Sequence, residues 1–243
     1  MNLPKITFLK KPCQLFESDY ECNGHLKPYR VMQLMQDAAT SHADEINLGW
    51  DNMAAHGILW ILSKVDVSFV RPITRGISQF NLYTWPLAPN RFYSERQFVA
   101  EKDGQPLFYA TTLWMLIERR DRKILSAEKM NEFCTSEYDT ARNDGVGNFL
   151  RVRMDDTFQY AYTKVVRRAD MDINGHVNNT NYVTYALDVL APDEQIKSLQ
   201  IVYNKELLYG DMVALYVKRE NTIVTVVGMR KEDTCFSVVM QLA

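Results

Sequence analysis

The chain lacks three features that would place it in a specialised class: a cysteine framework, an excess of charge of one sign and a long apolar run. Its four cysteines match neither a zinc-ligand spacing nor a CxxC redox pair, so free thiols are expected at Cys13, Cys22, Cys134 and Cys235. A net charge of -2 gives no electrostatic reason to expect nucleic acid or an anionic membrane as a partner. No run of about 18 apolar residues is present, so a membrane span is not expected.

Signals for export and for common cofactors are also missing. Residues 1–20 carry charges at Lys5, Lys10, Lys11 and Glu17, so they lack the apolar core of a signal peptide. No HExxH, P-loop or GxSxG motif occurs, so neither a metal nor a cofactor is expected. With 47% hydrophobic and 24% charged residues, the sequence is typical of a globular protein with a sizeable core. The prediction is a cytoplasmic protein.

The most informative feature that is present is an internal repeat. Residues 19–26 read DYECNGHL and residues 170–177 read DMDINGHV, and the two align without a gap. Asp, Asn, Gly and His are identical, and Glu21 corresponds to Asp172. Apolar residues at helical spacing follow each copy, within 28–39 and within 180–190. Such a duplication predicts two similar structural units in one chain.

Each copy is predicted to contain a strand, a helix and four further strands. The expected strands are 6–17, 59–70, 79–85, 92–100 and 107–117 in the first copy, and 158–167, 199–205, 212–219, 222–229 and 235–242 in the second. Residues 126–156 are polar, lack sustained periodicity and are interpreted as a linker. The prediction is an α+β protein with an N-terminal unit at 1–125, that linker, and a C-terminal unit at 157–243. If each sheet wraps its helix, the two units would share one continuous antiparallel sheet.

The loop at 172–179 collects side chains that could do chemistry. In an extended segment alternate side chains point the same way, so Asp172, Asn174 and His176 could share one face. Gly175 permits a sharp turn. Asn178 and Asn179 suit the entry of the following helix, where side-chain oxygens accept hydrogen bonds from unpaired N–H groups. The same composition is typical of an ordinary strand-to-helix turn, so these residues alone leave a catalytic loop and a structural turn as alternatives.

The two copies differ at the strand that follows each helix. When Gly76 is aligned with Gly210, the second copy has Glu206 where the first has Pro72. A site that needs a carboxylate base beside an amide and an imidazole is therefore expected in the second copy. A solvated strand-end carboxylate is the alternative for Glu206. The corresponding residues of the first copy are interpreted as keeping the turn geometry of a duplicated unit: Glu21, Asn23 and His25.

Two segments resemble the active-site region of the acyl-acyl carrier protein thioesterases of plants and bacteria. They are DINGHVNNTNYVTYALD at 172–188 and YNKEL at 203–207. The resemblance implies a tandem (double) hotdog fold, with a catalytic C-terminal unit and an N-terminal unit that binds the acyl chain. It also implies hydrolysis of fatty acyl-acyl carrier protein to the free fatty acid. By position, it assigns the catalytic residues as Asp172, Asn174, His176 and Glu206.

A hypothesis for the mechanism follows from the resemblance. The position after the catalytic Glu often holds a Cys in plant members and is Leu207 here, so direct attack by water is expected. Glu206 is the expected base, acting on a water that Asn174 also holds, while His176, oriented by Asp172, remains an alternative for the first proton. Backbone N–H groups at the start of the second helix are expected to stabilise the oxyanion. These belong to Val177 and Asn178.

The resemblance further implies sites for the acyl chain and for the carrier. Candidate lining residues of an apolar channel are Met32, Met35, Trp50, Met53 and Trp60, each of which could instead be ordinary core. An acidic carrier protein requires a basic docking surface. The sequence offers one cluster at Arg119, Arg120, Arg122 and Lys123, and another at Lys164, Arg167 and Arg168. Plant members carry a transit peptide that is not recognised here, which predicts a bacterial protein.

Other functions stay open at this point. The same fold and site could hydrolyse acyl-CoA instead of acyl-acyl carrier protein. A non-catalytic hotdog protein could bind acyl thioesters without cleaving them, and Glu206 would then be dispensable. A hydratase is less favoured, because the distant Glu fits water attack on a thioester better by resemblance. A homodimer is neither required nor excluded, because the duplicated chain already supplies the pairing that single hotdog domains obtain by dimerising.

Overall fold

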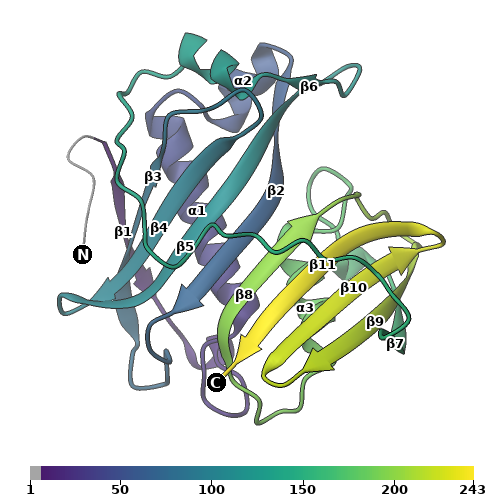
Figure 1. Cartoon of the computed structure of the whole chain (residues 1–243). Coiled ribbons are helices and arrows are strands. Elements are labelled where there is room, and N and C mark those ends of the chain that lie inside the picture. Colours follow the sequence, from purple (N-terminus) through teal and green to yellow (C-terminus); the bar gives the residue numbers. More distant parts are fainter. Residues whose placement is uncertain (1–6) are drawn as a thin grey trace.

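Strands dominate both halves of the chain, which the computed structural model describes over residues 7–243 (Figure 1). The first six residues of the expected N-terminal unit, with the start of its first strand, lie outside the described residues. The N-terminal half contains β1 (Leu9–Gln14), α1 (Pro28–Glu45), α2 (Trp50–Ala55), β2 (Ile58–Phe69), β3 (Gln79–Pro86), β4 (Ser94–Lys102), β5 (Gln105–Glu118) and β6 (Ile124–Leu125). The C-terminal half contains β7 (Gln159–Val165), α3 (Asn179–Leu187), β8 (Ile196–Tyr203), β9 (Met212–Glu220), β10 (Ile223–Arg230) and β11 (Asp233–Leu242).

These strands form one antiparallel sheet of 11 strands. Their order is β1-β3-β4-β5-β2-β8-β11-β10-β9-β7, and the short strand β6 pairs with β5. The two halves meet where β2 pairs with β8, from Lys64 opposite Val202 to Ser68 opposite Ser198. Pro12, which cannot donate to a ladder, lies on the end strand β1. The expected α+β tandem hotdog with one continuous sheet is confirmed.

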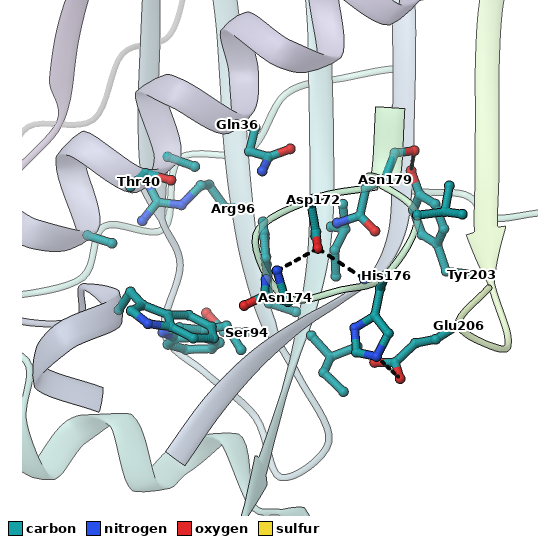
Figure 2. Close-up of a pocket in the computed structure, with 18 of the residues that line it drawn as sticks. Gln36, Thr40, Ser94, Arg96, Asp172, Asn174, His176, Asn179, Tyr203 and Glu206 are labelled. Atoms are coloured by element: carbon teal, nitrogen blue, oxygen red, sulfur yellow. Dashed lines mark hydrogen bonds and ion pairs between the residues drawn. The ribbon is translucent and has the colours of Figure 1, made fainter. Parts of the chain in front are cut away.

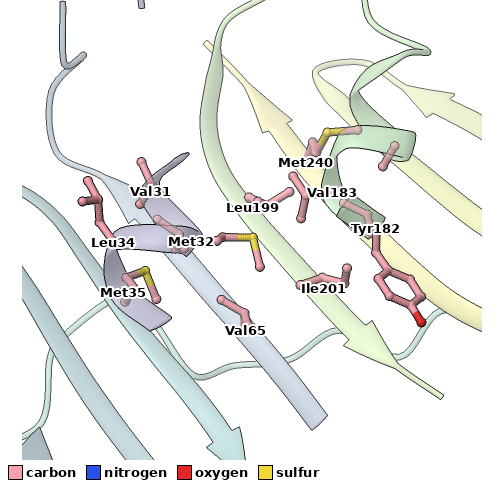
Figure 3. Close-up of a cluster of buried hydrophobic side chains, with 14 of the residues drawn as sticks. Val31, Met32, Leu34, Met35, Val65, Tyr182, Val183, Leu199, Ile201 and Met240 are labelled. Carbon is pink, nitrogen blue, oxygen red and sulfur yellow. The ribbon is translucent and has the colours of Figure 1, made fainter. Parts of the chain in front are cut away.

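The main hydrophobic cluster spans both units. On α1, Val31 and Met35 are buried, as the helical spacing predicted. On α3, Tyr182 and Val183 are buried in the same cluster. Figure 3 shows the strand residues of this cluster at the junction, namely Val65 of β2 with Leu199 and Ile201 of β8. Within residues 7–243, no helix combines the length and apolar character that crossing a bilayer would need.

Helix α3, the helix of the second copy, is shorter than its sequence pattern predicted. It has 9 residues, against 18 for α1, and ends at Leu187 although the apolar spacing continues to residue 190. The hydroxyl of Tyr162, on β7, donates to the carbonyl of Tyr185 at 2.6 Å, so one of the last helical carbonyls is satisfied from outside the helix. Pro192 follows closely, and the residue before a proline disfavours the helical conformation. The remaining residues therefore form a turn.

The linker fastens the two units across the sheet. After a 3-10 helix at Ala127–Glu132 it crosses the face of the sheet opposite to α1 and α3 (Figure 1). The buried carboxylate of Asp66, on β2, accepts from the N–H of Gly147 at 2.7 Å and from the Gln200 amide at 3.1 Å. Gln200, which is paired with Asp66 across β2 and β8, also accepts from a linker N–H. One linker segment is therefore bonded to both central strands.

Candidate active site

The repeated loops have the same local structure in both copies. Each begins with a short 3-10 helix, Glu17–Asp19 or Arg168–Asp170, whose last carboxylate accepts from the backbone N–H just before that helix. Each then turns at a glycine with positive φ, Gly24 at 81° and Gly175 at 77°, which glycine adopts without strain. The duplication is therefore structural as well as sequential.

Asp172 holds the backbone of the second loop. Its Oδ1 accepts from the N–H of Asn174 at 2.8 Å and from the N–H of His176 at 3.3 Å. These are bonds to main-chain atoms, as Figure 2 shows, so Asp172 stabilises the loop backbone and does not bond the imidazole. Within the described residues Asp172 makes no hydrogen bond to the ring of His176, so any effect of Asp172 on that ring acts through the loop backbone.

The imidazole of His176 instead contacts Glu206. Nε2 of His176 lies 3.3 Å from Oε2 of Glu206, and the two side chains are 28% and 42% exposed (Figure 2). The other carboxylate oxygen, Oε1, lies 2.5 Å from Nη2 of Arg122. Glu206 follows β8, where the N–H groups of Asn204 and Lys205 both donate to one carbonyl of β11. The strand end thus brings the carboxylate to the loop, and both of its oxygens have partners.

The backbone groups expected to form the oxyanion hole are already occupied. The N–H of Val177 donates to the Leu207 carbonyl, and the N–H of Asn178 donates to a carbonyl of the preceding turn, both at 2.9 Å. The side chain of Asn178 caps α3 by accepting from the N–H of Thr180 at 3.0 Å. The next residue, Asn179, has neither its N–H nor its amide group in a hydrogen bond with the described part of the chain. The unpaired donors at this helix start are therefore those of Asn179.

A cavity of about 670 Å³ joins these residues to the N-terminal unit. From the second unit, its wall includes Asp172, Asn174, His176, Asn179 and Glu206. From the first unit, it is lined by residues of α1, β2, β4 and β5, among them Gln36, Thr40, Trp60, Ser94, Arg96 and Trp114. In Figure 2, Thr40, Arg96 and Ser94 lie to one side of this cavity and the His176–Glu206 pair to the other. A ligand reaching from the pair would therefore extend into the N-terminal unit.

The structure places the expected channel residues in three different settings. Trp50 and Trp60 line the cavity. Met32 and Met35 line a separate void of about 20 Å³, which shares Gln36 and other wall residues with the cavity. Met53 is 1% exposed and belongs to a hydrophobic cluster beneath α2. Val177 lines the cavity, whereas Asn178 does not.

A buried cation near the cavity was not anticipated from the sequence. Arg96, on β4, is 7% exposed, and its Nη1 donates to Nδ1 of His42 at 3.1 Å and to the Thr84 hydroxyl at 3.2 Å. Burial lowers the pKa of Arg96 to about 10. Burial, and then the charge of Arg96, lower the pKa of His42 to about 4. His42 is therefore neutral at pH 7 and accepts from Arg96.

Cysteine and metal chemistry find no support in the described residues. None of the four cysteines lines the cavity, and Leu207, the residue after Glu206, is fully buried. Burial raises the pKa of Cys235, which lies on β11, and that of Cys13 to about 11. In residues 7–243, no group of three or more His, Cys, Asp and Glu side chains forms a metal-binding arrangement.

The first copy of the loop lies away from this cavity. Asn23 accepts from the N–H of His25 at 3.0 Å and donates to the carbonyl of Pro192 at 3.2 Å. Burial raises the pKa of Glu21. None of these three side chains contributes to the cavity wall. Their contacts close the turn and join it to the segment after α3.

Sequence reasoning missed the contributions that depend on contacts between residues distant in the chain. Arg122 was expected in a docking cluster, and its contact with Glu206 joins residues 84 positions apart. Arg230 donates to the Glu206 carbonyl at 3.4 Å and to Asp211 at 2.5 Å. The sequence predicts Asn179 at the helix entry as a hydrogen-bond acceptor, although the first residue of a helix also presents an unpaired N–H donor. The others have no local pattern.

Comparison with known proteins gives a consistent family assignment. The sequence matches the acyl-ACP thioesterase N-terminal domain over residues 9–136 and the acyl-ACP thioesterase C-terminal domain over residues 153–237. It is 22% identical over 204 residues to oleoyl-acyl carrier protein thioesterase 2 of Arabidopsis thaliana, which covers 75% of this chain and 55% of that protein. It is 25% identical over 194 residues to a dodecanoyl-[acyl-carrier-protein] hydrolase of Umbellularia californica, covering 72% of this chain and 50% of that protein. The chain thus spans about half the length of the curated relatives it matches.

Solved structures show the same fold over nearly the whole chain. An acyl-ACP thioesterase from Bacteroides thetaiotaomicron superposes with a TM-score of 0.86 at 19% identity, covering 97% of this chain and 98% of that one. The 12:0-ACP thioesterase from Umbellularia californica superposes with a TM-score of 0.80 at 19% identity, covering 97% of each chain. At these identities the superpositions concern the fold alone.

Proposed function

The chain belongs to the acyl-ACP thioesterase family, and on that premise we propose that it hydrolyses the thioester of fatty acyl-acyl carrier protein to the free fatty acid. The observation that carries the proposal is the 3.3 Å contact between His176 Nε2 and Glu206 Oε2 in the wall of the 670 Å³ cavity. The imidazole and the carboxylate meet there beside a space that can hold an acyl chain, and the Asn174 side chain lies in the same cavity wall. These are the groups that water attack on a thioester needs.

The two partners of Glu206 favour His176 as the base. A carboxylate that accepts from a guanidinium and from Nε2 of an imidazole has little capacity left for a further proton. Because Nε2 donates to Glu206, the proton of the neutral ring lies on Nε2 and Nδ1 is left as an acceptor. Water held by Asn174 gives its proton to Nδ1 while its oxygen attacks the thioester carbon. The same proton then passes to the thiolate as the carbon–sulfur bond breaks.

The oxyanion requires donors other than those first expected. Asn179 offers its backbone N–H and its side-chain amide at the start of α3, and both lie free of other described partners. Donors fixed before the reaction stabilise developing negative charge without reorganisation. The positive end of the helix dipole adds to this effect. We assign the oxyanion to Asn179 in place of Val177 and Asn178.

The two units have different tasks in this proposal. The catalytic residues come from the C-terminal unit, 157–243, and the acyl chain lies against α1, β2 and β5 of the N-terminal unit, 1–125. The carrier protein docks at the cavity mouth, where the turn 119–123 presents exposed basic side chains. Attack is by water, because no cysteine lines the cavity among the described residues.

The direct test is thiol release from acyl-acyl carrier protein over a panel of chain lengths. We expect saturable release of carrier thiol by the wild-type chain and loss of release in H176A. Matched acyl-CoA thioesters should give a lower kcat/KM than the carrier-bound chains. Binding of acyl-acyl carrier protein without thiol release would mean that the chain is a binding protein, and a higher kcat/KM on acyl-CoA would reassign the carrier.

A further inference from the structure

The contact between Arg122 and Glu206 crosses the boundary between the two units. Arg122 lies in the turn 119–123, which joins β5 to β6 in the N-terminal unit, and Glu206 follows β8 in the C-terminal unit. Nη2 of Arg122 lies 2.5 Å from Oε1 of Glu206, and the side chains are 49% and 42% exposed. Both residues line the cavity. The carboxylate is therefore held between Arg122 on one side and His176 on the other.

The turn that presents Arg122 is fixed by its own hydrogen bonds. The N–H of Glu118 donates to the Lys123 carbonyl at 2.8 Å, which closes the turn. The Glu118 carboxylate accepts from the N–H of Asp121 at 3.1 Å. The N–H of Arg119 donates at 2.8 Å to the carbonyl of Gly57, which lies just before β2. The guanidinium is thus delivered to Glu206 from an anchored backbone.

The backbone of Arg122 has a conformation that arginine does not favour. Its φ is +53°, in the left-handed region. Glycine adopts this region without strain, whereas other residues are destabilised there by about 1 kcal/mol or more. Turn formation alone would be served better by glycine at this position. The side chain that the turn presents from this backbone is the one that contacts Glu206.

The other cations around the cavity mouth are engaged elsewhere. Lys205 pairs with Asp233 at 2.7 Å. Arg230 pairs with Asp211 at 2.5 Å and reaches only the backbone carbonyl of Glu206. Among the described Lys and Arg side chains, only Arg122 forms an ion pair with the Glu206 carboxylate. The remaining residues of the basic cluster are exposed and form no ion pair with another described residue: Arg119, Arg120 and Lys123.

From these contacts we infer that Arg122 is a positioning residue for the proposed hydrolysis: it holds the Glu206 carboxylate in the direction of His176. The inference rests on the proposed function. A half-exposed carboxylate without this partner would sample other rotamers, and the imidazole would lose its orientation for part of the time. The basic cluster then divides by task, because Arg122 serves the chemistry while Arg119, Arg120 and Lys123 are available to the carrier.

The test compares variants on a carrier-free and a carrier-bound substrate. Acyl N-acetylcysteamine thioesters report on the chemistry alone, and acyl-acyl carrier protein reports on chemistry and docking. We expect R122A and R122G to lower kcat on both substrates by roughly 10- to 100-fold with little change in KM. R122K should recover part of kcat, because it keeps the charge but loses the planar fork. The matched control K231A removes another exposed basic side chain from a turn residue with positive φ, 57°, and should leave kcat on the carrier-free substrate unchanged.

Stability provides the second readout. Because glycine suits the left-handed backbone, R122G should keep the wild-type Tm or raise it while kcat falls, and added guanidinium ion should restore part of the lost kcat. Wild-type kcat in R122A and R122G would overturn the positioning role while leaving the proposed function intact. A fall in Tm that parallels the loss of kcat, with no recovery in guanidinium, would also overturn it. If the wild-type chain released no thiol from any thioester, the proposed function would be wrong, and the role of Arg122, which rests on it, would be wrong as well.

Discussion

Glu206 has two charged or polar partners at once, and that decides which substitutions at this residue are informative. As a base, the carboxylate would need a free oxygen near the water. As an orienting partner, it needs only to accept from Nε2 of His176, which it does at 3.3 Å. Glutamine can still accept a hydrogen bond but cannot take up the proton, so the amide variant separates the two roles.

We expect E206A to lower kcat by a factor of about 10²–10⁴. E206Q should retain clearly more activity than E206A, because its amide oxygen still receives the imidazole N–H. Steady-state thiol release measures both, with E232A as a control for loss of an exposed carboxylate. Equal losses in E206A and E206Q would make Glu206 the base, and near-normal turnover in E206A would remove it from the mechanism.

Met35 lies between the cavity and the core, so it is a candidate for setting the length of the bound chain. It is 2% exposed and lines the void of about 20 Å³ next to the cavity. In M35A the void should open into the cavity and favour longer acyl chains, since each further buried methylene contributes about 0.8 kcal/mol, or roughly four-fold in kcat/KM.

The control for this change is M53A, which removes a methionine of similar burial outside both spaces. Both variants should lose about 2–5 kcal/mol of stability, because each leaves a cavity in packed surroundings. Only M35A should alter the ranking of chain lengths in the thiol-release assay. An unchanged ranking in M35A would place the end of the acyl chain elsewhere.

The neutral imidazole of His42 makes stability depend on pH. Burial, and then Arg96, lower its pKa from 6.5 to about 4. The unfolded chain therefore binds a proton between these two pH values that the folded chain does not. This contribution to stability is present above about 6.5 and is lost as the pH falls towards about 4, by on the order of 3 kcal/mol.

Urea unfolding at pH 7, 5 and 4 measures this effect. H42Q keeps an acceptor for Arg96 without a titrating ring, so its free energy of unfolding should fall less than that of the wild type across the window. H56Q, at an exposed helix end, serves as the control for removal of an imidazole. Parallel pH curves for the wild type and H42Q would show that His42 does not carry the effect.

At the scale of elements, the turn 119–123 brings a basic surface to the cavity mouth. Its exposed side chains can attract an acidic carrier over a distance comparable to the Debye length, about 10 Å at moderate salt. We expect kcat/KM on acyl-acyl carrier protein to fall with rising ionic strength. The variant R119A/R120A/K123A should flatten that salt dependence.

Carrier-free thioesters provide the control for the turn. Their hydrolysis should respond little to salt or to the triple substitution, because steering acts on the encounter and not on the chemistry. The second basic cluster has a different setting, since Lys164 pairs with Asp170 at 3.2 Å at the far edge strand β7. Salt-independent kcat/KM on the carrier-bound substrate would argue against docking through the turn.

At the scale of the whole molecule, the two units are joined too closely to unfold separately. They share β2–β8 pairing, one hydrophobic cluster and a linker bonded to both central strands. All four tryptophans lie in the first half of the chain, at residues 50, 60, 85 and 114. Tryptophan fluorescence therefore reports on the N-terminal unit, whereas far-UV circular dichroism reports on both.

We expect the two signals to give coincident urea transitions, because neither unit can keep its core without the other. Equilibrium unfolding followed by both probes checks this. A circular dichroism curve with a second transition after the fluorescence change is complete would show that the C-terminal unit is stable alone.

The sequence by itself determined the architecture and the position of the candidate site. Local patterns were sufficient because alternation and helical spacing follow from backbone geometry, and because the repeated NGH turn is closed largely by hydrogen bonds among its own residues. The end of α3 was misjudged because a hydroxyl from β7 takes up a late carbonyl, which no local pattern records.

Only the tertiary structure decided what the site residues touch. Asp172 bonds the loop backbone, Glu206 bonds both His176 and Arg122, and the N–H groups of Val177 and Asn178 are already in use. Each of these contacts depends on the distance and the relative direction of two groups in the folded chain. Spacing along the chain limits which residues can meet, but folding of the C-terminal unit, and for Arg122 its packing against the N-terminal unit, selects the pairs that do.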